Sequence, residues 1–460
     1  MRTTSRAAKL SAVGISLALF LAACGSDSDG AKDTKKDDTT TTAAAGSDTT
    51  EPAEEDGPVP ADQNGGRTEG DGELVLGAVL PQSGNLAQLG PPMIAGAKMA
   101  VADINAAGGV NGKPVRLIVQ DDGGGANDDL AITSVDQLVN NENVDAIIGA
   151  AASGTSKSII DKVTAGGTVQ CSPSNTGSDL TQWPDKGLYF RTPPADNLQA
   201  QALAKSILDD GKQNVAVIAQ NTDYGTGFVR FLTPALEDAG AKIVADVTYD
   251  DQGTGFDAEV EKVVGSTPDA VALIGYPEDG GKVLAEMLKQ GVDFSETTIY
   301  VTDGMQSNEL YLNVDESKPA ITADIKGTAP SAAPESGASF FPEAFAAFAP
   351  DVESPIYSAQ SYDCVMAIAL AAQKAESDAP FDIAANISSI TRPEGDADEK
   401  CDTFKDCADL LADGKDIDYD GASGALDFTD YGEPSAGSYD VYVFGDDGSY
   451  ETMEQVVVGE

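Results

Sequence analysis

The chain has 460 residues, with 76 acidic and 28 basic side chains and a formal net charge of −48. This length allows two or three domains, and the acidity argues against nucleic acid or an anionic membrane surface as a partner, because both bind basic patches. Histidine is absent, which excludes Ser-His-Asp and Cys-His nucleophiles and imidazole metal sites and favours binding over catalysis.

The N-terminus has the pattern of an export signal. Three basic residues within the first nine precede an uncharged apolar run, 10–23, which is too short to span a membrane as a helix. The run ends in the letters LAACG at residues 21–25, which resemble a bacterial lipoprotein box. The resemblance implies that residues 1–23 are a removed signal peptide and that Cys24 carries the lipid. A plain signal peptide with a chance cysteine is the alternative.

The next segment, 24–72, contains mainly Ser, Asp, Thr, Ala, Gly and Pro. It has too few large apolar residues to offset the entropy of ordering, so we expect a disordered acidic tether. A lipid anchor, a tether and a folded body together describe a protein held on the extracytoplasmic face of a cell membrane.

Four cysteines follow Cys24, and an even number in an exported protein indicates disulfides. Cys401 and Cys407 are close in a polar loop, so we expect them to pair and to contribute about 2 kcal/mol. Cys171 and Cys364 either pair with each other or stay as small buried thiols. No CxxC spacing supports a zinc site, and no metal is expected.

From Glu73 onward, short apolar runs alternate with stretches of helical periodicity. The first series predicts four strands and two helices, and after Arg191 a second series predicts four more strands with intervening helices. The predicted strands are 74–80, 115–120, 145–149, 168–171, 215–220, 243–248, 270–275 and 298–302, and the predicted helices are 93–104, 128–140, 226–239, one ending at 290 and a long one at 357–375.

Apolar strands separated by helices predict an α/β fold with parallel sheets covered on both faces. Two such series predict two doubly wound lobes. Ligands of these folds bind beyond the carboxyl ends of the strands, so the polar residues that follow each strand are candidates for the site.

In the first lobe, two hydroxyl-rich loops follow neighbouring strands. Ser153 and Thr155 lie where a strand leads into a helix, and Ser174 and Thr176 follow the next strand. Hydroxyls and the free N–H groups of a helix start attract an anion, so the two loops can converge on one carboxylate. Helix capping and turn formation are the alternative roles.

In the second lobe, Tyr224, Tyr276 and Asp303 each follow a strand. Half-buried surface rings and an Asx turn are the alternatives for these residues. As a set, neutral donors on one lobe and a carboxylate with aromatic rings on the other describe a cleft for a zwitterionic amino acid, held by charge-assisted hydrogen bonds.

Four stretches carry a specific resemblance, namely LGAVLPQSG at 76–84, DINAAGGVNG at 103–112, SPSNT at 172–176 and DYG at 223–225. With them, most of residues 73–460 resembles the leucine/isoleucine/valine-binding family of solute-binding proteins that serve ABC importers. The resemblance implies the type I periplasmic-binding-protein fold, in which three crossovers form a hinge between two lobes. Lobe 1 would comprise 73–193 plus 327–437, and lobe 2 would comprise 194–326 plus 438–460.

The resemblance also assigns roles to the candidate residues. Ser153 and Thr176 fall where the family binds the α-carboxylate, and Ser174 would contribute its backbone. Tyr224 and Tyr276 fall at the aromatic positions of the second lobe. Asp303 falls where an acidic residue, usually Glu, binds the α-ammonium.

The resulting hypothesis is a lipid-anchored receptor that captures an amino acid, branched-chain or otherwise aliphatic, and delivers it to the membrane permease of an ABC importer. It predicts no enzymatic activity and no cofactor. The alternatives are the same fold binding an amide, urea or an aromatic acid, and a sensory lipoprotein that does not transport its ligand.

Overall fold

The computed structural model describes residues 69–392 and 399–459. The predicted signal peptide, Cys24 and the tether up to residue 68 lie outside this part of the chain. The last two residues of the predicted tether, Asp71 and Gly72, donate backbone hydrogen bonds of 2.9–3.0 Å to the carboxylate of Asp378. The packed body therefore begins slightly before the predicted boundary.

The first sheet has five parallel strands in the order β2-β1-β3-β4-β5. Alternate side chains of β1 enter different cores: Leu76 and Ala78 pack towards α1 and α10, and Val75 and Val79 pack towards α2 and α3. Both faces are therefore covered, as the apolar strands predict. The elements are β1 Val75–Leu80, α1 Gly90–Ala106, β2 Arg116–Asp121, α2 Asp128–Asn140, β3 Ala146–Gly149, α3 Ser153–Ala165, β4 Val169–Ser172, β5 Tyr189–Arg191, α10 Ser358–Ala375 and α11 Pro380–Thr391.

The second sheet has seven strands in the order β15-β14-β10-β9-β8-β6-β7. Strands β6 to β10 run parallel, whereas β14 and β15 are antiparallel additions at one edge, so the sheet is mixed. Helices α4 and α5 pack on one face, and α6 and α7 pack on the other. The elements are α4 Asp196–Asp209, β6 Asn214–Gln220, α5 Asp223–Asp238, β7 Lys242–Tyr249, α6 Asp257–Gly265, β8 Ala270–Ile274, α7 Pro277–Lys289, β9 Thr298–Val301, α8 Leu312–Asp315, β10 Lys326–Pro330, β14 Gly437–Phe444 and β15 Tyr450–Val458.

The chain passes between the two sheets three times, after β5, after β10 and before β14. These connections are called the first, second and third crossover below. The second one corrects a predicted boundary, because 327–330 was assigned to lobe 1 but belongs to β10, which pairs with β9 and β14. The apolar-run pattern does not reveal this strand, Lys-Gly-Thr-Ala-Pro, because it contains little that is strongly hydrophobic.

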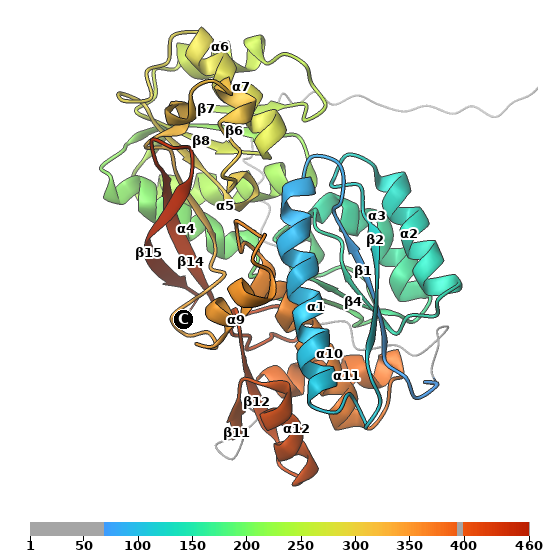
Figure 1. The fold of residues 1–460 in the computed structure, drawn as a ribbon. Helices are drawn as coiled ribbons and strands as arrows, with labels where there is room; N and C mark the ends of the chain where they lie inside the picture. The colour runs from blue at the N-terminus through green and yellow to red at the C-terminus, as the bar shows by residue number, and fades with distance from the viewer. Residues whose placement is uncertain (1–68, 393–398, 460) are drawn as a thin grey trace, which may run out of the picture. The chain divides into compact units, whose positions relative to one another are not determined.

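A third, small sheet orders its strands β11-β12-β13 and packs with α12 beside α10 and α11 (Figure 1). Its elements are β11 Glu399–Cys401, α12 Phe404–Ala412, β12 Ile417–Gly421 and β13 Gly424–Ala425, and α9 Phe341–Phe348 precedes α10. A disulfide joins Cys401 to Cys407 within it, with Cα atoms 5.3 Å apart. A second disulfide joins Cys171 of β4 to Cys364 of α10, a pairing that the sequence left open.

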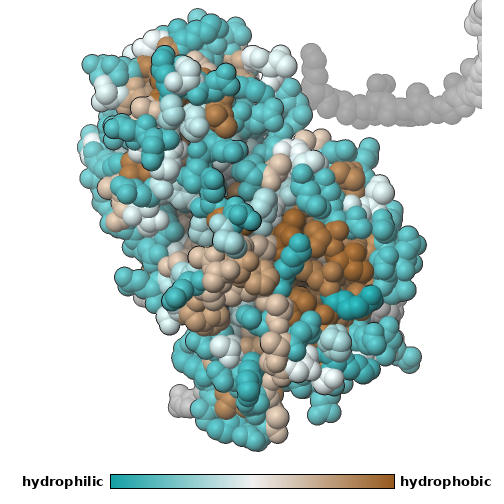
Figure 2. Space-filling view, in the orientation of Figure 1, coloured by the Kyte–Doolittle hydropathy of each residue, from teal (hydrophilic) through white to brown (hydrophobic). Residues whose placement is uncertain are grey.

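The surface reflects the composition, since hydrophilic residues cover most of the face in Figure 2. One hydrophobic area lies over α1 and β2, where Ile94, Val101, Leu117 and Val119 are only partly buried. In the described part of the chain, no helix has the length and apolar character needed to cross a membrane.

Candidate functional site

The first wall of the site is built from the loops after β3 and β4, which bind each other. Ser153 begins α3, is almost fully buried, and its Oγ accepts a hydrogen bond of 3.1 Å from the backbone N–H of Gly177. Within the described part of the chain this hydroxyl donates to no acceptor, so its proton stays available for a ligand. The Thr155 hydroxyl instead donates to Asp128 at 2.9 Å, so of the two hydroxyls considered in this loop only Ser153 keeps its proton free.

Ser174 fixes the two loops together. Its hydroxyl donates to the carbonyl of Ala151 at 3.0 Å, and its N–H lies 3.3 Å from the Ser172 hydroxyl. The Asn175 side chain adds donor contacts of 3.1 and 2.8 Å to the carbonyls of Ala150 and Ala151. Ser174 therefore uses both of its donors within the protein, so the N–H that the predicted backbone contact would use is already bonded.

A buried carboxylate also binds the loop after β3 in this wall. Asp122 accepts from the N–H of Ala151 at 2.9 Å and from the N–H of Gly124 at 2.7 Å. Burial raises the pKa of Asp122 to about 7, and these two backbone hydrogen bonds oppose the rise. The loop after β3 is thus fixed by the protein before any ligand arrives.

The second wall brings the predicted Tyr224, Tyr276 and Asp303 together. The two tyrosine rings stack with centroids 5.6 Å apart and planes 3° apart. The Tyr224 hydroxyl lies 2.6 Å from Thr302 Oγ1 and donates to Asp303 Oδ1 at 2.8 Å. Asp303 lies just beyond β9, in the buried short helix Asp303–Met305. The three residues that the sequence analysis groups on the second lobe therefore contact one another, and Asp303 is buried.

Two further residues that the sequence reasoning missed also bind Asp303. Gln199 donates to its Oδ1 at 2.8 Å, and the Tyr357 hydroxyl donates to its Oδ2 at 2.6 Å. Burial raises the pKa of Asp303, while these hydrogen bonds and that of Tyr224 lower it. Tyr357 comes from the segment before α10, 54 residues further along the chain, so no local pattern links it to the site.

The most unusual group is Asp196, which the sequence reasoning also missed. It is fully buried at the first turn of α4, and neither carboxylate oxygen has a hydrogen-bond partner among the described residues. Burial and the nearby charge of Asp303 raise the pKa of Asp196 to about 8. The Thr176 hydroxyl lies near enough to oppose this rise, but not in hydrogen-bond geometry. Asp196 and Asp303 are called the carboxylate pair below.

Asp196 also connects the two walls. Its N–H donates to the carbonyl of Thr176 at 2.8 Å, and Thr176 is itself almost fully buried. The predicted carboxylate-binding loop and the predicted ammonium-binding acid therefore meet at the start of α4. An acid in the first turn of a helix usually serves the helix dipole at the surface, which explains why its sequence context gave no signal.

A cavity of about 220 Å³ opens between the walls. Tyr224 and Tyr276 line it on one side, and Ala152, Gly154 and Thr155 line it on the other. Ser153, Ser174, Thr176 and Asp303 do not line this cavity and lie buried behind it. At its rim, Lys157 of α3 forms an ion pair of 2.8 Å with Asp223 of α5, so the two lobes touch directly.

A second buried charge cluster contacts the loop after β4 in the first wall. Arg191 is fully buried and binds Glu433 of the third crossover through Nε at 2.8 Å and through Nη2. It also donates to the carbonyl of Gly177 at 2.8 Å and to the Thr181 hydroxyl at 2.8 Å. Arg191 and Glu433 are called the crossover ion pair below. No group of three or more Cys, Asp or Glu side chains within residues 69–392 and 399–459 is arranged to hold a metal.

The chain is similar in sequence to known amino-acid-binding proteins. The leucine-, isoleucine-, valine-, threonine- and alanine-binding protein of Pseudomonas aeruginosa is 30% identical over 46% of this chain and 56% of its own length. A Leu/Ile/Val-binding protein homolog of Brucella melitensis is 28% identical over 52% of this chain and 63% of its own length. The chain thus aligns with roughly three fifths of these relatives.

Solved structures share the fold over most of the chain. The leucine-binding protein LivK of Thermotoga maritima superposes with a TM-score of 0.69 over 84% of this chain and 99% of its own, at 21% identity. LivJ of Streptococcus pneumoniae is a branched-chain amino acid transporter substrate-binding protein, solved in complex with isoleucine. It superposes with a TM-score of 0.68 over 84% of this chain and 100% of its own, at 23% identity. The fold is that of the type I periplasmic binding proteins.

The family model described as periplasmic binding protein matches residues 73–406, which is well over half of the chain. One family accounts for the two sheets with three crossovers, the cavity between their facing loops and the Leu/Ile/Val-binding relatives. The chain belongs to the periplasmic binding protein family, among relatives that bind branched-chain amino acids.

Proposed function

We propose that this protein is the extracytoplasmic, lipid-anchored solute-binding component of an ABC importer, and that it captures an aliphatic amino acid of the branched-chain class between its lobes. The observation that carries the proposal is the fully buried carboxylate of Asp196, which lies beside Asp303 and has no hydrogen-bond partner among the described residues. A buried charge without a partner is costly, and an ammonium group placed there would compensate it.

The opposite wall suits the other end of an amino acid. Ser153 keeps a free hydroxyl proton at the start of α3, and a helix start attracts a carboxylate through its N–H groups. The stacked faces of Tyr224 and Tyr276 offer an apolar surface for a side chain. The ligand preference of the relatives named above supports the branched-chain assignment.

Two matched ligands test the ammonium site. We expect L-leucine to bind the purified protein at least tenfold more tightly than 4-methylpentanoate, which is leucine without its amine. The Asp303→Ala variant should lose at least tenfold in leucine affinity and little in 4-methylpentanoate affinity, measured by calorimetric titration. Equal loss for both ligands, or unchanged leucine affinity, would remove the ammonium role of Asp303.

The same titrations separate the alternative ligands. Acetamide, urea and benzoate carry no positive charge to offset the carboxylate pair, so each should bind more weakly than leucine. Tighter binding of any of them would replace the amino-acid assignment. Loss of labelled leucine uptake in a strain without the gene would support transport, whereas unchanged uptake would favour the sensory alternative.

The lipid anchor rests on residues 21–25 and is tested separately. Cys24→Ala should move the protein from the membrane fraction to the soluble exported fraction. Mass spectrometry of the N-terminal peptide should show a lipid-modified Cys24 in the unaltered protein. An unmodified peptide would indicate the plain signal peptide instead.

A further inference from the structure

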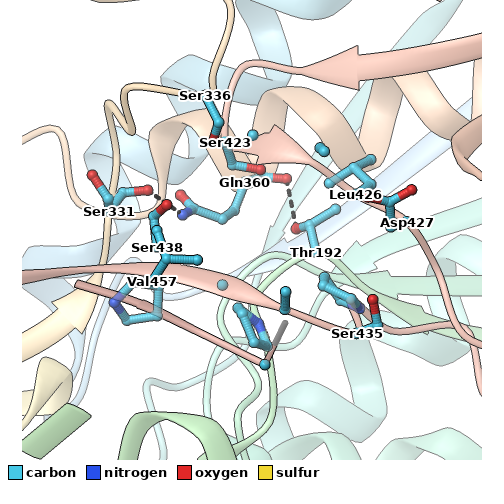
Figure 3. A pocket seen from close by; sticks show the side chains of 18 residues that line it. Thr192, Ser331, Ser336, Gln360, Ser423, Leu426, Asp427, Ser435, Ser438 and Val457 are labelled. Carbon is cyan, nitrogen blue, oxygen red and sulfur yellow. Dashed lines mark hydrogen bonds between the residues drawn. The ribbon is translucent and has the colours of Figure 1, made fainter. Parts of the chain in front are cut away.

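A second cavity lies where the three crossovers run side by side, and it shares no residue with the cavity between the lobes (Figure 3). Its volume is about 330 Å³, which is at the small end of the range for ligand pockets. Each crossover contributes to its walls, through Thr192, Ser331 and Ser435 among others. The loop after β12, Gln360 of α10 and the end of β15, through Val457, also line the cavity.

The lining is rich in hydroxyl groups and almost free of charge. The hydroxyl residues are Thr192, Ser331, Ser336, Ser423, Ser435 and Ser438. The single ionisable side chain is Asp427, and no lysine or arginine contributes. A cavity with one carboxylate and no cation, in a protein of net charge −48, does not suit an anion.

Gln360 provides an independent observation that points to a ligand. Its side chain is 2% exposed, and its Nε2 donates to the carbonyl of Ser331 at 2.8 Å. Its Oε1 has no hydrogen-bond partner among the described residues. A buried amide oxygen left unpaired costs about 1–3 kcal/mol, so a ligand with a hydrogen-bond donor at this wall would recover that energy.

We propose that this crossover cavity is a second binding site, and that it takes a small uncharged polyol or monosaccharide. Hydroxyl groups of such a ligand can donate to Gln360 Oε1 and to Asp427 and can exchange hydrogen bonds with the serine hydroxyls. An apolar molecule of the same size would leave Gln360 Oε1 unpaired, and it would also strip water from the hydroxyls of the wall.

The position of the cavity gives the ligand a consequence beyond binding. The crossovers are the only covalent links between the two sheets within the described residues, so any change in the angle between the lobes changes the walls of the cavity. A ligand lodged there favours the angle at which it fits, and by linkage it alters the affinity for a ligand between the lobes. This coupling, but not the binding itself, rests on the function proposed above.

Titration of the purified protein with myo-inositol, followed by backbone amide NMR, tests the site directly. We expect saturable shifts at Ser331 and Ser438, smaller shifts at Tyr224, and no saturable shifts with cyclohexanol, a ring of the same size with one hydroxyl. Ala436→Leu, which fills the cavity, should weaken binding at least tenfold. Gln360→Met, which removes the amide, should weaken it at least threefold.

The control variant is Ala347→Leu, the same change at an exposed position of α9 outside this cavity, and it should leave myo-inositol binding unchanged. The proposal fails if no saturable shift occurs, if Ala436→Leu binds myo-inositol as tightly as the unaltered protein, or if cyclohexanol binds equally well. These titrations contain no amino acid, so their outcome is independent of the proposed function.

A second titration tests the coupling. Leucine affinity should change at least threefold at saturating myo-inositol, and the change should disappear in Ala436→Leu. Unchanged leucine affinity in a protein that does bind myo-inositol would overturn the coupling. A protein that binds myo-inositol but not leucine would overturn the proposed function and leave the crossover cavity as a binding site.

Discussion

Two neighbouring clusters of buried charge in this protein differ in whether their charges have partners. In the crossover ion pair, Arg191 bonds Glu433, Gly177 and Thr181, so the positive charge is fully compensated. In the carboxylate pair, Asp303 has three donors, but Asp196 has none among the described residues and lies beside a group of the same charge.

The difference distinguishes a cluster with a structural role from a cluster with a ligand-binding role. A compensated buried ion pair fixes a unique arrangement of chain segments, here the third crossover and the loop 175–177. An uncompensated buried carboxylate destabilises the empty protein, and such a cost is typical of a site whose ligand supplies the missing charge. Removing one member from each cluster should therefore have opposite effects on stability.

Glu433→Gln should give the largest change in stability. It leaves Arg191 fully buried without its counter-charge, which should lower the free energy of unfolding by about 3–5 kcal/mol. The measurement is urea unfolding. Glu399→Gln is the matched control, because Glu399 pairs with Lys415 at the surface and its loss should cost less than about 1 kcal/mol. Similar losses in both variants would show that the crossover ion pair is not structural.

Asp196→Asn should separate stability from binding. The variant removes a buried carboxyl group whose oxygens have no hydrogen-bond partner among the described residues, so the stability of the empty protein should be unchanged or higher. Its affinity for leucine should fall about 10- to 100-fold, because a charge-assisted hydrogen bond contributes about 1.5–3 kcal/mol. A large loss of stability with full leucine affinity would reverse the roles assigned to the two clusters.

The pH dependence should follow the raised pKa of Asp196. A carboxyl group with a pKa of about 8 in the folded protein and about 3.9 in the unfolded chain binds more protons when folded. Stability should therefore fall as the pH rises from about 4 to about 8, by at most about 1.4 kcal/mol per pH unit from this group.

The comparison with Asp196→Asn isolates that contribution, because other buried acids such as Asp122 titrate in the same range. The variant should show a smaller loss of stability between pH 5 and pH 8. Leucine binding near pH 6.5 should release a proton, seen as a buffer-dependent calorimetric enthalpy that the variant lacks. The same pH profile in both proteins would contradict the raised pKa of Asp196.

The smallest effect should come from the rim of the cleft. Lys157→Met breaks the ion pair with Asp223 that joins α3 to α5. Because both partners are partly exposed, leucine affinity should fall less than about fivefold, which is within the worth of a surface pair, about 1 kcal/mol at most. The loss should shrink further at high salt. A larger loss would mean that Lys157 binds the ligand itself.

The sequence predicts much of the scaffold because its signals are local. Apolar runs and helical periods placed β1, β3, β6 and β8 within one or two residues, and α2 at its observed bounds. The sequence pattern does not predict strand β10, because its residues are mostly small or polar. Only its pairing with β9 and β14 identifies it as a strand. Its assignment moved the second crossover past residue 330.

The candidate site shows the same division. The sequence by itself determined which residues follow the strands, and these include Ser153, Tyr224 and Asp303. Only the tertiary structure decided what they contact. Tyr357 and Gln199 reach Asp303 from distant segments, and Asp196 is fully buried where the start of α4 meets the loop after β4. Periodicity encodes which face of an element is buried, but the partners and the dielectric surroundings of a buried charge depend on segments that meet only after folding.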